Sequence, residues 1–182
     1  MDFYTNRLHI RPVNIKDNQS IFKYRFDSET HRYLSLIPET VEDVSDFISR
    51  TSNEINIPGT WFQFVIIEQD SDTLIGDIGI HFLETDSENM QAEIGYTLDL
   101  NYRGKGYATE ALTEIIDYLI NDLNKHRIIA SIDPSNSNSI RLIERLGFTK
   151  EAHFKESLFF HGEWVDDLIY AILAKEWKSK KD

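Results

Sequence analysis

The 182-residue sequence contains no cysteine, which excludes disulfide bridges, thiolate ligands to a metal and a cysteine nucleophile. A chain without cysteine suits a reducing compartment, so we expect a cytoplasmic protein. The six histidines show no spacing typical of metal ligands, such as His-x-x-x-His. We therefore expect no metal.

Long apolar runs are also missing. No stretch approaches the roughly 18 consecutive apolar residues that a membrane-spanning helix needs, and residues 1–12 do not resemble a signal peptide. Internal repeats, low-complexity tracts and linkers rich in proline, glycine or serine are absent too. We therefore expect one soluble domain over residues 1–182, with no membrane partner.

Basic residues are scarce relative to acidic ones. Lysine and arginine number 19 against 31 aspartates and glutamates, which gives a net charge of −12. Such a surface repels nucleic acid phosphates, so no nucleic acid partner is expected. The excess acid either attracts a cationic substrate or only maintains solubility.

What the sequence does contain is a regular succession of strand-like and helix-like segments. Alternating apolar residues predict strands, and apolar residues recurring every three or four positions predict helices. The order β-α-α-β-β-β-α-β-α-β-β is typical of an α/β (mixed α+β) domain with helices on the faces of a sheet. The predicted strands cover 8–11, 61–67, 74–82, 90–98, 128–132, 148–159 and 164–173, and the predicted helices cover 17–26, 42–55, 108–119 and 137–146.

The segment richest in chemistry follows the fourth predicted strand. A turn with Gly104 and Gly106 leads into the best-defined helix, with Arg103 and Lys105 beside the glycines. Glycines let the backbone approach a phosphate, and free N–H groups at a helix start point toward an anion. A dinucleotide fingerprint is excluded because Thr109 stands where it needs glycine, and the ending of a Walker loop is absent. The segment is either another phosphate cradle or a plain turn.

A second segment, residues 136–148, also follows a strand and opens a helix. Asn136 is a good helix cap, and Gly147 is a common helix stop. Asn-x-x-Ser at its start and Leu-Gly-Phe at its end resemble the second signature of the GNAT acetyltransferase superfamily. The pattern Arg103-x-x-Gly106-x-Ala108 resembles the pyrophosphate loop of the same superfamily.

The resemblance covers nearly the whole chain. The opening, 5–12, and the ending, 162–177, look like the RimJ/RimL-type branch, the ribosomal-protein N-terminal acetyltransferase-like proteins. It implies a GNAT fold with a mostly antiparallel, twisted sheet of about seven strands, a splayed central pair and helices on both faces. It also implies acetyl-CoA as co-substrate and direct transfer to an amine without a covalent enzyme intermediate. A homodimer is compatible with it, because dimers are common among such proteins.

The resemblance also assigns the residues expected to bind CoA. The diphosphate is expected on the backbone amides of the glycine-rich turn, and the pantetheine arm beside the strand that precedes the turn. In GNAT proteins the asparagine of the second signature contacts that arm. The expected set is Leu98, Leu100, Arg103, Gly104, Lys105, Gly106, Tyr107, Ala108, Thr109, Asn136 and Ser139.

Two residues are expected to handle protons. Amine attack needs a neutral nucleophile, and Glu93 is the candidate base because it lies on the central strand, on the face opposite Ile94 and Tyr96. Many GNAT enzymes protonate the departing sulfur with a tyrosine where this chain has Ile143. The RimJ/RimL-type branch has a serine at the position of Ser139, which becomes the candidate acid. The alternatives are a solvated glutamate and a serine bonded within its own helix turn.

The acceptor is less constrained than the donor. The leading hypothesis is acetylation of a protein N-terminal α-amine or another cationic primary amine. The alternatives are acetylation of a polyamine, which the missing tyrosine weakens, acetylation of an aminoglycoside, and a non-catalytic acyl-CoA-binding module. Trp61 and Phe62 either line the acceptor cleft or belong to the core, and the acidic stretch 84–88 either attracts a cation or is a solvated loop.

Overall fold

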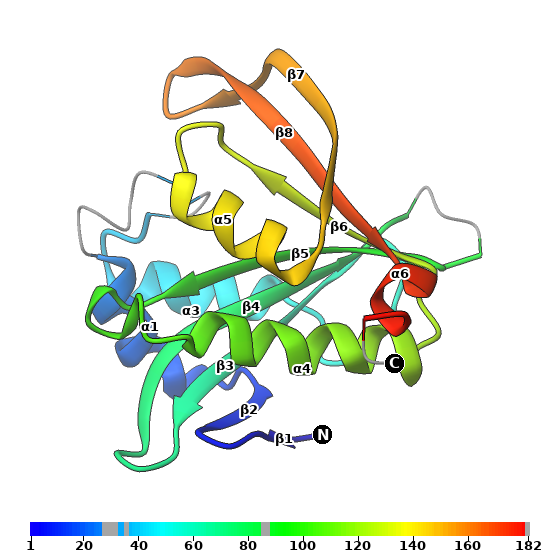
Figure 1. The fold of residues 1–182 in the computed structure, drawn as a ribbon. Helices are drawn as coiled ribbons and strands as arrows, with labels where there is room; N and C mark the ends of the chain where they lie inside the picture. Colours follow the sequence, from blue (N-terminus) through cyan, green and yellow to red (C-terminus); the bar gives the residue numbers. More distant parts are fainter. Residues whose placement is uncertain (27–32, 35–36, 85–87, 181–182) are drawn as a thin grey trace.

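The computed structural model describes residues 1–26, 33–34, 37–84 and 88–180, and its strands form one twisted sheet (Figure 1). The eight strands lie in the order β1-β2-β3-β4-β5-β6-β8-β7. Within the described ranges β5 and β6 run parallel, and the other neighbouring strands pair antiparallel. This confirms the expected mostly antiparallel sheet. The eighth strand is a two-residue pairing too short for an alternation pattern to reveal.

The elements follow the predicted order. The strands are β1 (Phe3–Tyr4), β2 (Leu8–Pro12), β3 (Trp61–Glu68), β4 (Thr73–Phe82), β5 (Gln91–Leu98), β6 (Arg127–Ile132), β7 (Thr149–Phe160) and β8 (Glu163–Leu173). The helices are α1 (Asn18–Arg25), α3 (Val41–Arg50), α4 (Tyr107–Asn121), α5 (Ser137–Leu146) and α6 (Ala174–Lys178), with 3-10 turns η1 (Ile15–Asp17) and η2 (Leu100–Tyr102).

The prediction of a helix over 42–55 is wrong at its end. The start of α3 is fixed by a capping box, in which Thr40 and Asp43 bond each other's backbone N–H groups. The helix stops at Arg50 because Thr51 is extended (φ −79°, ψ 148°), and the Ser52 N–H then donates to the Trp61 carbonyl at 2.7 Å. Tertiary pairing with β3 thus ends a helix whose apolar pattern continues.

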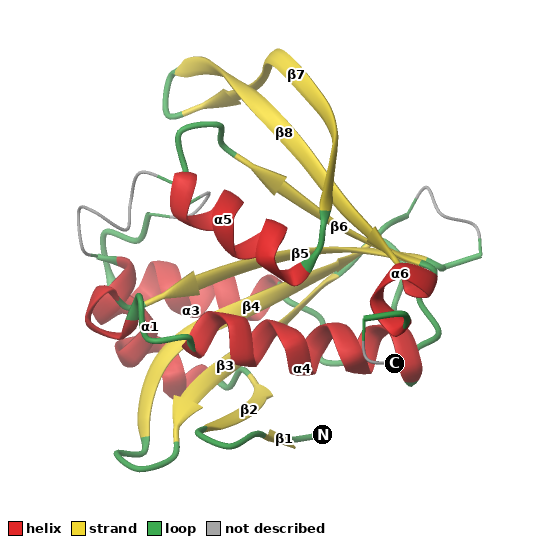
Figure 2. Ribbon diagram, in the orientation of Figure 1, coloured by secondary structure: helices red, strands yellow, loops and turns green. Residues whose placement is uncertain are grey.

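Helices cover both faces of the sheet, as predicted. Figure 2 shows α4 and α5 on the near face and α1 and α3 behind it. The apolar stripe of α4 is buried in the main core, and a smaller core joins α1 and α3 to the far face of β3. None of the described helices is long and apolar enough to cross a membrane. The main stripe consists of Ala111, Leu112, Ile115, Ile116, Leu119 and Ile120.

A buried carboxylate fixes α1 on its face. Asp77 of β4, 2% exposed, accepts hydrogen bonds from Arg25 Nη2 (2.6 Å), Gln63 Nε2 (2.7 Å) and the Tyr24 hydroxyl. Burial lowers the pKa of Arg25, but the adjacent Asp77 outweighs this and raises it, so the guanidinium stays charged. Removing one partner would leave an uncompensated buried charge, which costs about 3–5 kcal/mol.

The sheet is open between β5 and β6. These strands pair only over 91–93 opposite 127–129. Beyond that point the described strands share no further register pair, although β5 stays paired with β4 to Leu98 and β6 with β8 to Ile132. Figure 1 shows the two strands diverging. The expected splayed central pair is present, and it leaves main-chain polar groups that need partners in the middle of a sheet.

Candidate active site

The turn after β5 has the backbone geometry of an anion cradle. Gly104 (φ 73°) and Gly106 (φ 85°) adopt the left-handed conformation that favours glycine. Gly106 is the N-cap of the 15-residue helix α4, whose first N–H groups face this exposed turn. Beside the turn, Leu100, Ala108 and Thr109 are half-buried. The predicted cradle residues therefore come together in one loop at the positive end of a helix dipole.

The side chains of this turn are held by local contacts. Arg103 Nε donates to the carbonyl of Leu98 at 2.9 Å, which ties the loop to the end of β5. The Lys105 ammonium lies 5.5 Å from the ring centroid of Tyr102, on the solvent side. Tyr107 is buried at the start of α4. The loop is thus anchored on both sides, while its glycines and Lys105 remain exposed.

A residue that sequence reasoning missed clasps the same turn. Arg7 donates from Nε to Glu110 Oε2 (2.7 Å) and from Nη1 to the Lys105 carbonyl (3.0 Å). Its guanidinium carbon lies 4.2 Å from the ring centroid of Tyr107. Burial raises the pKa of Glu110, but hydrogen bonds from Thr5 and Arg7 outweigh it, so the pKa lies below its usual value. Arg7 therefore offsets the one acidic side chain in the first turn of α4.

Glu93 lies where β5 and β6 part. Its Oε2 is 3.6 Å from His81 Nδ1 on β4, and the carboxylate side chain is 28% exposed. The His81 ring stacks on Trp61, with centroids 4.8 Å apart and planes 7° apart. Burial raises the pKa of Glu93, His81 lowers it, and Asp167 on β8 raises it; the net direction is upward. A partly buried carboxylate of raised pKa at a strand opening fits a general base better than a solvated glutamate.

The two aromatic residues expected at the acceptor cleft separate. Phe62 is buried in the main core, whereas Trp61 is exposed and stacks on His81 next to Glu93. Alternation along β3 sends neighbouring side chains to opposite faces. Phe62 therefore fits a core residue, and Trp61 fits a residue that lines the acceptor cleft. The acidic stretch 84–88 lies largely outside the described residues and stays a prediction.

The start of α5 meets β5 across the opening. The Asn136 side chain caps the helix by accepting from the Ser139 N–H at 3.1 Å. The Ser139 Oγ is 2.5 Å from the hydroxyl of Tyr96, so the serine is not bonded only within its own helix turn. Ile143 is fully buried and offers no proton. Tyr96 is a second residue that sequence reasoning did not assign to the site.

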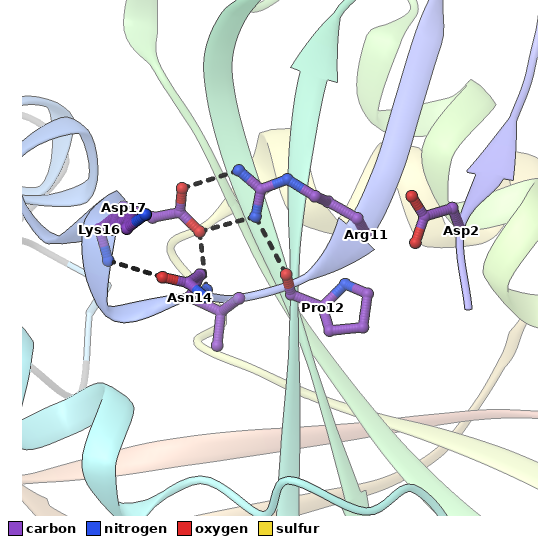
Figure 3. A pocket seen from close by; sticks show the side chains of 7 residues that line it. Asp2, Arg11, Pro12, Asn14, Lys16 and Asp17 are labelled. Atoms are coloured by element: carbon purple, nitrogen blue, oxygen red, sulfur yellow. Dashed lines mark hydrogen bonds and ion pairs between the residues drawn. The ribbon is translucent and has the colours of Figure 1, made fainter.

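A hollow of about 410 Å³ lies at the connection from β2 to η1 (Figure 3). Its central charges are paired, because Asp17 accepts two bonds from Arg11 at 2.8 Å each, and it contains none of the candidate residues. The described residues include no group of three or more histidines, aspartates or glutamates that could hold a metal ion.

The candidate residues follow one another along β5. Glu93 stands at the closed end of the opening, Tyr96 with Ser139 beyond it, then Leu98 and the cradle. At about 3.3 Å per residue, Glu93 and Leu98 lie roughly 16 Å apart. A long ligand lying along this strand could therefore reach from the glycine-rich turn to the Glu93 carboxylate.

Comparison with known proteins identifies the family. Residues 7–149 match the acetyltransferase (GNAT) domain family. The chain is 35% identical to the uncharacterized N-acetyltransferase p20 of Bacillus licheniformis, over 96% of this chain and 97% of that protein. It is 33% identical to the [ribosomal protein uS5]-alanine N-acetyltransferase of Escherichia coli (strain K12), over 69% of this chain and 64% of that protein. The crystal structure of a GNAT-family acetyltransferase from Bacillus anthracis matches with a TM-score of 0.85 and 31% identity, over 97% of this chain and 100% of that chain. The chain belongs to the GNAT acetyltransferase family, as the sequence resemblance predicted.

Proposed function

We propose that this cytoplasmic N-acetyltransferase transfers the acetyl group of acetyl-CoA directly to the α-amine of a protein N-terminus. The observation that supports this most is the row formed by Glu93, the Tyr96–Ser139 pair and the glycine-rich cradle along one open strand edge. The acceptor rests on the similarity to an enzyme named for ribosomal protein uS5 and on the net charge of −12, which favours a cationic protein substrate.

The residues present fit acetyl-CoA, which when bound supplies an acyl group activated as a thioester. The N–H groups at the start of α4 and the exposed cradle would hold the diphosphate. The open edge of β5 would pair with the amides of the pantetheine arm, as an added strand does. Backbone N–H groups along the same edge would stabilise negative charge on the carbonyl oxygen as it develops.

Two side chains would move the protons. Glu93 would take a proton from the acceptor ammonium, directly or through water, because only the neutral amine can attack a carbonyl. Its raised pKa makes it a stronger base than an ordinary glutamate. Ser139 would donate to the sulfur as the carbon–sulfur bond breaks. Asn136 would hold Ser139 at the helix start through its cap and would contact the pantetheine arm.

Replacing Arg7 by alanine is expected to weaken acetyl-CoA binding roughly tenfold. The substitution frees the Lys105 carbonyl and removes the positive charge beside Glu110, which keeps only its hydrogen bonds from the Thr5 hydroxyl and the residue 7 backbone N–H next to the proposed diphosphate site. Isothermal titration calorimetry on the full chain measures the dissociation constant for acetyl-CoA. Arg50→Ala is the matched control, because it removes an exposed arginine at the end of α3 on the opposite face. Equal affinities in the two variants would show that the clasp does not shape the cradle.

The acceptor is tested by CoA release with a panel of amines. We expect peptides with the N-terminal sequences of ribosomal proteins to give the highest kcat/KM, with mass added at the α-amine. A peptide with a blocked α-amine and a free lysine is the control. A higher kcat/KM for spermidine or an aminoglycoside would assign a small-molecule acceptor. Acetyl-CoA binding without release for any amine would instead support a binding module.

A further inference from the structure

Tyr96 occupies a position for which the proposed proton transfers give no role. It lies on β5 three residues beyond Glu93 and points to the opposite face, toward α5. Its hydroxyl is 2.5 Å from Ser139 Oγ and 3.4 Å from the Ser139 carbonyl oxygen. The side chain packs against the main core and is only partly exposed. The contact joins two elements on either side of the strand opening.

The direction of this hydrogen bond decides what Ser139 can do. A serine hydroxyl has one proton to donate and can accept from others. If Ser139 donates to Tyr96, its proton is consumed. If Tyr96 donates to Ser139, the serine proton is free for a third partner. The backbone N–H of Ser139 is already engaged by Asn136, so the hydroxyl is the group left to face a ligand.

Tyr96 is suited to be the donor of the pair. Burial raises the pKa of the Tyr96 hydroxyl to about 12, against a lowering by its bond to Ser139. The phenol therefore keeps its proton throughout the neutral range. The pair then holds two protons, of which the short contact uses one.

We propose that Tyr96 is a positioning residue that donates to Ser139 Oγ and so directs the serine proton toward the departing sulfur. The inference rests on the proposed acetyl transfer. In that step the acceptor nitrogen bonds to the acetyl carbon, and the carbon–sulfur bond breaks with its electron pair going to sulfur. The acceptor ammonium loses two protons. One goes to Glu93, and the other reaches the sulfur through Ser139, which gives its own proton and takes one back from nitrogen. Tyr96 stays protonated.

The test compares kcat and KM in Tyr96→Phe, Ser139→Ala and the double variant. We expect kcat to fall roughly 100-fold without the serine hydroxyl and roughly tenfold without the tyrosine hydroxyl, with the KM for acetyl-CoA unchanged. The double variant should match Ser139→Ala, because Tyr96 acts through the serine. Tyr170→Phe is the matched control: Tyr170 is also buried and also bonds α5, through Glu144 at 3.1 Å, and its kcat should equal that of the wild type.

Several outcomes would overturn the inference. A double variant that loses the product of the two single effects would show that Tyr96 acts independently of Ser139. A kcat unchanged in Tyr96→Phe would remove its role while leaving acetyl transfer intact. An alkaline fall in kcat below about pH 10 that disappears in Tyr96→Phe would mean that the phenol loses its proton. A wild type that binds acetyl-CoA but releases no CoA with any amine would contradict both the proposed function and this inference.

Discussion

A glutamate in place of Gly106 is expected to abolish acetyl-CoA binding. Gly106 has a φ of 85° at the N-cap of α4, and a Cβ there would lie 3.4 Å from Arg7 Nη2. The new carboxylate would stand in front of the N–H groups proposed to hold the diphosphate and would repel it. We expect the affinity to fall at least about 100-fold, which corresponds to about 2.7 kcal/mol, as measured by calorimetry.

A second glycine supplies a matched control for this variant. Gly162, in the turn between β7 and β8, has a φ of 86°, and a Cβ added to it meets nothing within 4 Å. Gly162→Glu introduces the same charge and similar backbone strain in the turn between the last two strands of the sheet, which are separated from β5 by β6. Its affinity for acetyl-CoA should match the wild type. A similar loss in both variants would attribute the effect to strain or net charge, and unchanged binding in Gly106→Glu would remove the diphosphate from this turn.

Replacing Glu93 by glutamine should lower kcat roughly 100-fold and leave acetyl-CoA affinity within about twofold. Glutamine keeps the size of the side chain at the strand opening, but it cannot take a proton from the acceptor ammonium. Initial rates of CoA release and a binding titration separate the two quantities. Glu163→Gln, an exposed strand glutamate of β8, is the control and should keep its kcat. A kcat of Glu93→Gln equal to that of the wild type would assign the base to another group or to water alone.

The pH dependence of kcat tests the role of Glu93 independently. Burial raises the pKa of Glu93 above its ordinary value of 4.5, with Asp167 adding to the rise and His81 opposing it. Only the carboxylate acts as a base, so kcat should decline as the pH falls through this raised pKa. The midpoint is therefore expected above 4.5. The residual rate of Glu93→Gln should lack this acid limb. An acid limb retained at the same pH in Glu93→Gln would assign it to a group other than Glu93.

Features that depend only on residues close together in the chain could be predicted from the sequence. The cradle needs glycine where φ is positive, and Gly104 and Gly106 stand at such positions. The helix after them was readable from its apolar period, and the cap of α5 from Asn136. The turn at 161–162 combines two positive φ angles in a sequence ending in Gly162. In each case the physical requirement is local, so the pattern is local too.

Features that depend on distant pairing could not be predicted. Arg7 and Glu110 are 103 positions apart, and Tyr96 and Ser139 are 43 apart. No spacing rule connects such pairs, because the sheet brings them together. The alternation pattern places Tyr96 on one face of its strand, but it does not show that the Ser139 hydroxyl of α5 lies beside it. The raised pKa of Glu93 likewise depends on burial and on charges from β4 and β8.

The divergence of β5 from β6 has a consequence for how such proteins change over time. A ligand paired with an open strand edge is recognised by main-chain N–H and C=O groups, which every residue other than proline supplies alike. With acetyl-CoA on this edge, as proposed, substitutions along the edge alter its recognition little. The surface beside Glu93, the proposed base, is made instead of side chains, among them Trp61 and His81. Point substitutions there can exchange one acceptor for another while the donor stays the same. Proteins that share this fold are therefore expected to share the donor more often than the acceptor.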